Sequence, residues 1–287
     1  MTQPQLHDWT EASRKRNIIQ ERYEPIQPYI AFELAQRIRA TVVLDVGANI
    51  GFYSVVLGSL ESVESIFSFE PMPTPFRELN ENIGLNGLAN KAKLFQLAAS
   101  DSRSEVIVNV YGESSGANSI AATSIHKNKT PIGKIAVQTD TIDHLIPVQG
   151  VAAFIKIDVE GHEFEALTGA NKFFTSNKGV LQVEIYSDNQ SDGDIRNWLN
   201  NLGWEEFFSA GPDIYFSNIP EIVQADSMVD VMKVVSQRLI DRKDVKPRRG
   251  GAQRREDAPI KRQLLPGLSI EITGSLSRRL RKLFKSN

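Results

Sequence analysis

Hydrophobic and polar positions alternate along the chain in a way that predicts strands and helices in turn. Short apolar runs rich in β-branched residues predict strands, and segments with apolar residues at helical spacing follow most of them. Strands are expected at 41–47, 63–71, 92–100, 104–112, 134–142, 151–161, 179–187, 205–209 and 213–217. Helices are expected at 22–40, 50–60, 74–88, 162–174 and 192–204. This alternation is typical of an α/β fold, with a mostly parallel sheet covered by helices on both faces.

The same pattern divides the chain into four parts. Residues 1–40 form a helical lead-in, and residues 41–220 carry the strand–helix alternation. Residues 221–245 hold an amphipathic helix. Residues 246–287 form a basic tail, which we expect to be partly disordered because it is rich in charge, glycine and proline. Near its end, the stretch "SLSRRLRKLFK" predicts a short amphipathic helix with basic residues around an apolar face.

Composition and charge narrow the class of protein. The hydrophobic content of 41% is enough for a sizeable core, and the absence of cysteine excludes disulfides and cysteine-based metal sites. Neither a secretory signal nor an apolar run of membrane-spanning length is visible, so we expect a cytoplasmic protein. The net charge of −2 hides an asymmetry. Residues 246–287 carry 12 lysines and arginines against 3 acids, so the rest of the chain is strongly acidic.

The stretch "TVVLDVGANIGFYSVVLG" joins the first predicted strand to a helix through a glycine-containing loop. Gly47 and Gly51 allow a tight turn and a close approach by a ligand, at the sheet edge where ligands bind in such folds. Asp45 precedes the loop, and Glu70 ends the second strand, where an acid can accept hydrogen bonds from both ribose hydroxyls. The loop and Glu70 therefore predict a nucleoside-containing ligand.

Two such ligands fit, and they imply different functions. A dinucleotide, which would make the protein an oxidoreductase, is disfavoured because the middle glycine of its fingerprint is missing and Asp45 would repel a pyrophosphate. S-adenosylmethionine carries no phosphate, and its ammonium group suits Asp45. A non-catalytic binding module and glycines that serve packing alone remain as further alternatives.

A second group of polar residues follows the strand at 151–161. The stretch "KIDVEGHE" brings together Asp158, Glu160, His162 and Glu163, and Glu184 ends the next strand. Transfer of a methyl group to a hydroxyl is helped by a base, and histidine has a suitable pKa. We therefore consider His162, Asp158, Glu160 and Glu184 as catalytic candidates. Three acids at one edge could instead bind Mg²⁺, which we do not favour, and Glu160 and Glu163 also suit the first turn of the following helix.

Four stretches make the chain similar to a known family. "VVLDVGANIGFYSVVLG", "FEPMPTPFRELNENIGLNGL", "LAASD" and "IKIDVEGHEFEALTGA" resemble the FkbM-type methyltransferases over about half of the chain. The resemblance implies a class I methyltransferase (Rossmann-like) seven-stranded sheet, S-adenosylmethionine as donor, and O-methylation of a sugar, glycolipid or secondary metabolite. It also implies that the cofactor is contacted by Asp45, Gly47, Ala48, Asn49, Gly51, Glu70, Pro71, Ala99, Asp101 and Asp158.

Two further segments carry hypotheses about partners. The insert at 101–150 contains a stretch rich in serine, glycine and asparagine, in which Asn118 and Ser119 are candidate contacts for the acceptor. The basic tail suits peripheral contact with an anionic membrane surface, with docking on a protein or nucleic acid as the alternatives, nucleic acid being the less favoured.

Overall fold

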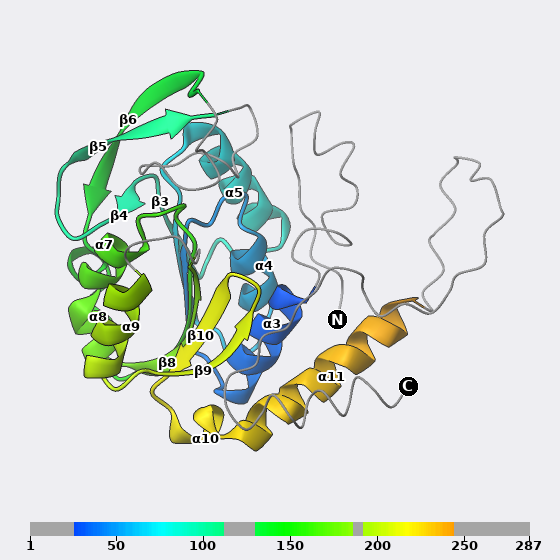
Figure 1. Cartoon of the computed structure of the whole chain (residues 1–287). Coiled ribbons are helices and arrows are strands. Elements are labelled where there is room, and N and C mark those ends of the chain that lie inside the picture. The colour runs from blue at the N-terminus through cyan, green and yellow to red at the C-terminus, as the bar shows by residue number, and fades with distance from the viewer. Residues whose placement is uncertain (1–25, 112–129, 186–191, 244–287) are drawn as a thin grey trace, which may run out of the picture.

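The computed structural model describes residues 26–111, 130–185 and 192–243 (Figure 1). Its central sheet has seven strands in the order β3-β2-β1-β7-β8-β10-β9. Neighbouring strands pair in parallel, except that β10 runs antiparallel to β8 and β9. The bounds are β1 Val42–Val46, β2 Ser65–Phe69, β3 Ala92–Phe95, β7 Ala152–Ile157, β8 Lys178–Glu184, β9 Glu205–Ala210 and β10 Asp213–Ser217. The predicted mostly parallel seven-stranded sheet is confirmed.

Helices cover both faces of this sheet, as Figure 1 shows. One face packs against α3 (Gln27–Arg37), α4 (Phe52–Gly58), α5 (Pro73–Leu85), α10 (Pro220–Val223) and α11 (Ala225–Lys243). The other packs against α6 (Ile142–Leu145), α7 (Glu163–Thr168), α8 (Asn171–Ser176) and α9 (Asp192–Asn201). Strands buried on both faces explain why the sequence shows nearly continuous apolar runs here. Among the described residues, none of these helices combines the length and hydropathy needed to cross a bilayer.

The strand order reverses between β1 and β7, and open α/β sheets form their ligand-binding crevice at such a reversal. From β1 the chain moves outward to β2 and β3, and then returns to place β7 on the other side of β1. Ligands of open α/β sheets bind at such a reversal, outside the carboxyl ends of the strands. The loops that follow β1, β2, β7 and β8 therefore frame the candidate site.

A row of polar side chains crosses the sheet beneath this edge. The row consists of register partners, one on each of the adjacent strands β2, β1, β7, β8 and β10. In that order they are Ser68, Asp45, Lys156, Gln182 and Tyr215. All of them are buried. Buried polar groups are costly without partners, so the contacts within this row bear on the site above it.

The predicted strand at 92–100 is wrong as one continuous element. It is β3 followed by β4 (Ala98–Ala99), which belongs to a second sheet with the order β4-β6-β5. In this sheet β5 spans Glu105–Val110 and β6 spans Gly133–Asp140. The break follows Phe95, whose ring stacks on Phe69 at 4.6 Å between centroids and so holds β3 in the main sheet. The small sheet packs on Met72, close to the carboxyl end of β2.

The predicted helix at 162–174 is also two elements, α7 and α8. Gly169 lies between them, so close to the carbonyl oxygen of Ser100 that a Cβ atom would clash with it. The carboxylate of Asp143 then accepts hydrogen bonds from the N–H groups of Lys172 and Phe173 and begins α8. The close backbone approach and this cap, both between segments distant in sequence, explain the break.

Several predictions fall outside the described residues. They concern Asn118 and Ser119 in the insert, residues 1–25 of the lead-in, and the tail at 246–287. Where an amphipathic helix is expected at 221–245, the structure has α11, which joins α3 through an ion pair between Arg238 and Glu33.

Candidate active site

The loop after β1 is held in a conformation that favours glycine. Gly47, Asn49 and Gly51 have φ angles of 80°, 52° and 85°. A Cβ atom on Gly47 would clash with the carbonyl oxygen of Asp158, and one on Gly51 would lie 2.6 Å from Cδ1 of Leu79. The two glycines are therefore required by close packing on both sides of the loop, as well as by backbone conformation.

Glu70 ties this loop to the end of β2. One carboxylate oxygen accepts from the N–H of Asn49 at 2.9 Å, and the other accepts from the N–H of Met72 at 2.8 Å. The acid therefore joins the loop after β1, through Asn49, to the loop after β2, which contains Pro71 and Met72. Each carboxylate oxygen can accept a further hydrogen bond, which suits a ribose. Burial raises the pKa of Glu70 to about 7.

Asn82, which the sequence analysis missed, supports the same loop from α5. Its side-chain N–H donates to the carbonyl oxygen of Ile50 at 2.7 Å, and the residue is fully buried. An asparagine on the buried face of a predicted helix is the signal that could have found it, because such a group needs a partner.

Asp45 is buried within β1, below the sheet edge where a ligand contact was expected. Its carboxylate accepts hydrogen bonds from the N–H and the hydroxyl of Ser54, at 2.9 and 2.5 Å, and Ser54 also contacts the hydroxyl of Ser68 at 2.8 Å. Only 2% of Asp45 is exposed, and burial raises its pKa to about 6. Asp45 thus fixes the first turn of α4, and its contact with a ligand ammonium stays a prediction.

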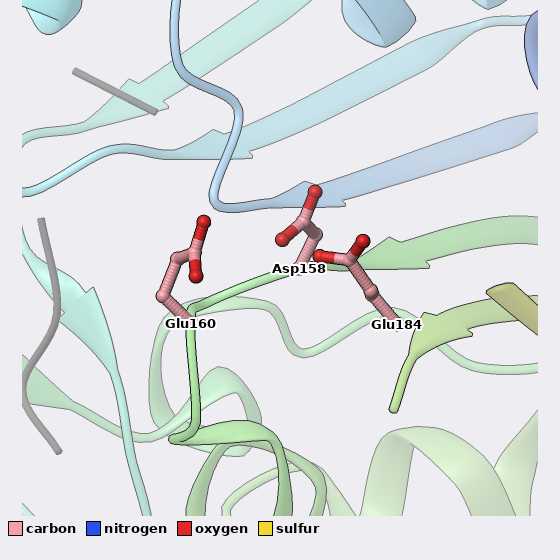
Figure 2. Close-up of side chains that lie close together, drawn as sticks. All are labelled: Asp158, Glu160 and Glu184. Atoms are coloured by element: carbon pink, nitrogen blue, oxygen red, sulfur yellow. The ribbon is translucent and has the colours of Figure 1, made fainter. Parts of the chain in front are cut away.

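Three predicted acids come together across the crevice from Glu70. Carboxylate oxygens of Asp158, Glu160 and Glu184 all lie within 4.8 Å of one another. Figure 2 shows the side chains converging from the loop after β7 and from the end of β8, with Asp158 beside Glu184. Burial, and then the charge of Asp158, raise the pKa of Glu184 to about 10, so this acid carries its proton at neutral pH and can donate it in a hydrogen bond.

The backbone at Glu160, in the loop after β7, is strained. Glu160 has a φ of 55° and Gly161 a φ of 98°. The carboxylate of Glu163 accepts from the N–H groups of Gly161 at 2.9 Å and Val159 at 3.3 Å, and so closes the turn. Left-handed backbone in a residue other than glycine is found at functional sites that neighbouring contacts hold in place.

Lys156 lies beneath the acid cluster. Its ammonium nitrogen is 3.4 Å from a carboxylate oxygen of Asp158 and 3.1 Å from one of Asp213. The nitrogen also lies 5.2 Å from the centre of the Tyr53 ring. This lysine therefore reaches two acids rather than solvent.

His162 contacts a different part of the edge. Its Nε2 lies 3.0 Å from the hydroxyl of Ser100, and its Nδ1 lies 3.4 Å from a carboxylate oxygen of Glu165. Burial lowers the pKa of His162, which favours the neutral imidazole. Ala99 is buried beside Ser100, whereas Asp101 is exposed. His162 therefore lies with the candidate adenine contacts, and its role as a base stays a prediction.

More than half of the chain matches the sequence model of a known domain. Residues 45–205 match the sequence model of the methyltransferase FkbM domain. The chain belongs to this family. The matched part of this FkbM protein starts at Asp45 and includes the glycine loop, Glu70 and all three acids of the cluster. Asp213 and α11 lie beyond it.

Individual relatives and solved structures are similar to this chain at low sequence identity. It is 31% identical over 156 residues to the hexuronic acid methyltransferase AglP of Haloferax volcanii. The match covers 51% of this chain and 56% of that protein, so the chain spans about half the length of this curated relative. The FkbM methyltransferase structure from Methylobacillus flagellatus KT is 18% identical, with 68% of this chain and 49% of that chain covered and a TM-score of 0.48. The structure of TYW2 from M. jannaschii in complex with AdoMet is 16% identical, with 67% and 77% covered and a TM-score of 0.36.

Proposed function

We propose that this protein transfers the methyl group of S-adenosylmethionine to an oxygen atom of a sugar-containing acceptor. The observation that carries the proposal is the placement of one carboxylate on one side of the glycine loop and of three on the other. Glu70 lies on the β2 side, and Asp158, Glu160 and Glu184 lie on the β7 and β8 side. Membership of the FkbM methyltransferase family supports methyl transfer as the reaction.

The residues around the loop fit S-adenosylmethionine, which supplies an electrophilic methyl group on a positively charged sulfur. In our proposal Glu70 binds the ribose, the loop at 47–51 lies against the ligand, and Ala99 and Asp101 face the adenine. Asp158 then lies on the side of the sulfonium group, whose positive charge its carboxylate would attract. A pyrophosphate would suit this edge poorly because the acids would repel it.

On the acceptor side, we propose that the acid cluster accepts the proton that the acceptor hydroxyl releases. The acceptor oxygen forms a bond to the methyl carbon as the bond from carbon to sulfur breaks, and the hydroxyl proton passes to the carboxylate of Asp158. Protonated Glu184 holds Asp158 by a hydrogen bond, which orients the base. Asp158 is favoured over His162 because both ring nitrogens of His162 already face Ser100 and Glu165.

The negative charge of the acid cluster also bears on which kind of oxygen atom of the acceptor is methylated. A hexuronic acid, the acceptor named for the relative from Haloferax volcanii, has both hydroxyl and carboxylate oxygens. A carboxylate placed beside Asp158 and Glu160 would be repelled, whereas a neutral hydroxyl would be bound and deprotonated. We therefore propose a hydroxyl as the methylated group.

Two measurements test this function. Isothermal titration should detect S-adenosylhomocysteine and should detect no NAD; the reverse result would favour an oxidoreductase. A methyl-transfer assay should then use matched glycosides of glucose and glucuronic acid. The methylated product should resist mild alkali, as an ether does. A product that alkali cleaves is an ester and would contradict the hydroxyl assignment, whereas cofactor binding without transfer would favour a binding module.

A further inference from the structure

We propose that Lys156 is a positioning residue that fixes the carboxylate of Asp158 for methyl transfer. The inference rests on the proposed function, in which Asp158 receives the proton of the acceptor. It follows from a buried chain of contacts that runs beneath the crevice from Asp213 on β10 through Lys156 to Asp158.

The position of Lys156 is unusual for a lysine. Its side chain is 4% exposed, near the carboxyl end of a central strand whose sequence is otherwise apolar. Lysine is almost never fully buried unless it is paired, because an ammonium group loses its hydration there. The ion pairs with Asp158 and Asp213 meet this requirement, and they join the interior of the sheet to the candidate active site.

The far end of the chain of contacts is rigid. The oxygen of Asp213 that binds Lys156 also accepts from the side chain of Gln182 at 2.7 Å. The same amide group donates to the hydroxyl of Tyr53 at 3.0 Å, and the Tyr53 ring lies under the ammonium group. Strands β8 and β10 and helix α4 thus hold the ammonium nitrogen in one place.

Asp158, at the other end of this chain of contacts, needs a side-chain contact to fix its position. Asp158 lies just after β7, and the turn that follows has left-handed backbone at Glu160. The backbone of Asp158 is held by β1, since its N–H donates to the carbonyl oxygen of Val46 at 3.0 Å. Two contacts hold its side chain: Lys156 pairs with one carboxylate oxygen, and Glu184 donates a hydrogen bond to the carboxylate. Removing the lysine should therefore take away one of these two contacts, let the carboxylate turn about the other, and leave the backbone in place.

Positioning predicts a specific effect on the kinetics. A displacement of about 1 Å at a reacting group can lower the rate by roughly a hundredfold. Lys156→Met should accordingly lower kcat by at least about tenfold. The dissociation constant of S-adenosylhomocysteine should change by less than about threefold, because Glu70 and the glycine loop are untouched. Lys156→Arg, which keeps the charge, should recover part of the lost kcat.

Asp213→Asn is the matched control. An asparagine oxygen still accepts from Lys156 and Gln182, so the ammonium group keeps its two partners and kcat should fall much less than in Lys156→Met. If Lys156 served only the stability of the sheet, Asp213→Asn and Lys156→Met would lower kcat in proportion to their losses in melting temperature. Should Lys156→Met fail to fold, Lys156→Gln replaces it, because its shorter neutral side chain can reach Asp213 or Asp158 but not both.

A crystal structure of the Lys156 variant completes the test. We expect the Asp158 carboxylate to rotate away from its present position while its backbone does not move. An unchanged Asp158 side chain, or an unchanged kcat, would overturn the inference. If the wild-type protein binds S-adenosylhomocysteine but methylates no oxygen acceptor, the proposed function fails, and the crystal structure alone still decides whether Lys156 positions Asp158.

Discussion

Gly47 and Asp158 lie in backbone contact across the reversal point of the sheet, so closely that a Cβ atom on Gly47 would clash with the carbonyl oxygen of Asp158. The loop that would hold the cofactor and the loop that carries the acids are therefore one packed unit. A change in either loop should be felt in the other.

Gly47→Ala tests this contact. The alanine would have to adopt a φ of 80° and would also push the loop away from Asp158. We expect the affinity for S-adenosylhomocysteine to fall by at least about tenfold, or about 1.4 kcal/mol, in a titration. Gly203→Ala is the control, because Gly203 has a φ of 78° but open space around it. Equal losses of affinity in the two variants would show that backbone strain alone is responsible.

Glu70→Ala tests the ribose contact. The ribose hydroxyls would lose a charged acceptor, and hydrogen bonds to charged groups contribute roughly 1.5–3 kcal/mol, so the affinity should fall by about tenfold or more. The exposed Glu64, at the other end of β2, provides the control variant Glu64→Ala. An unchanged dissociation constant in folded Glu70→Ala protein would remove Glu70 from the cofactor site.

The raised pKa of Glu70 predicts a pH dependence. Burial moves the pKa of Glu70 from its ordinary value of 4.5 to about 7, so the protonated form of Glu70 is favoured in the ligand-free protein. Its contribution to stability is full below pH 4.5 and is lost as the pH rises through about 7. Ribose hydroxyls stabilise the ionised acid, so affinity for S-adenosylhomocysteine should rise from pH 6 to pH 8 with release of a proton. Titration in buffers of different ionisation enthalpy measures that proton, which should vanish in Glu70→Gln.

Asp158→Asn separates the candidate bases. It should lower kcat by about 10²–10⁴-fold if Asp158 receives the proton, whereas His162→Gln should have a much smaller effect. The opposite ranking would restore His162 as the base. EDTA should leave the wild-type rate unchanged, since we assign the acid cluster to proton transfer. Loss of activity in EDTA with recovery in Mg²⁺ would instead assign Asp158, Glu160 and Glu184 to a metal.

Much of the sheet could be predicted from the sequence because buried strands and amphipathic helices carry local patterns. The same holds for the acids that end strands, since the carboxyl ends of parallel strands meet at one edge. The breaks after Phe95 and at Gly169 could not be predicted, because they depend on contacts with Phe69 and Ser100, which are distant in sequence. The partners of a buried polar group are hidden for the same reason. The charge of Lys156 is visible in an apolar strand, but the register that brings it to Asp213 is not.

The basic tail leads to the last prediction, which rests on sequence and charge because residues 246–287 lie outside the described part of the chain. These residues carry 12 lysines and arginines against 3 acids. Each basic residue near an anionic bilayer contributes about 1 kcal/mol, and the apolar positions at 276, 280, 283 and 284 would add burial. The full chain should therefore float with anionic vesicles at low salt and release them as salt is added. A chain that ends at Val245 retains the whole sheet and α11, so it should still bind S-adenosylhomocysteine but should no longer float. If the full chain does not float with anionic vesicles even at low salt, the tail has another partner, and binding of the two chains to nucleic acid is the next comparison to make.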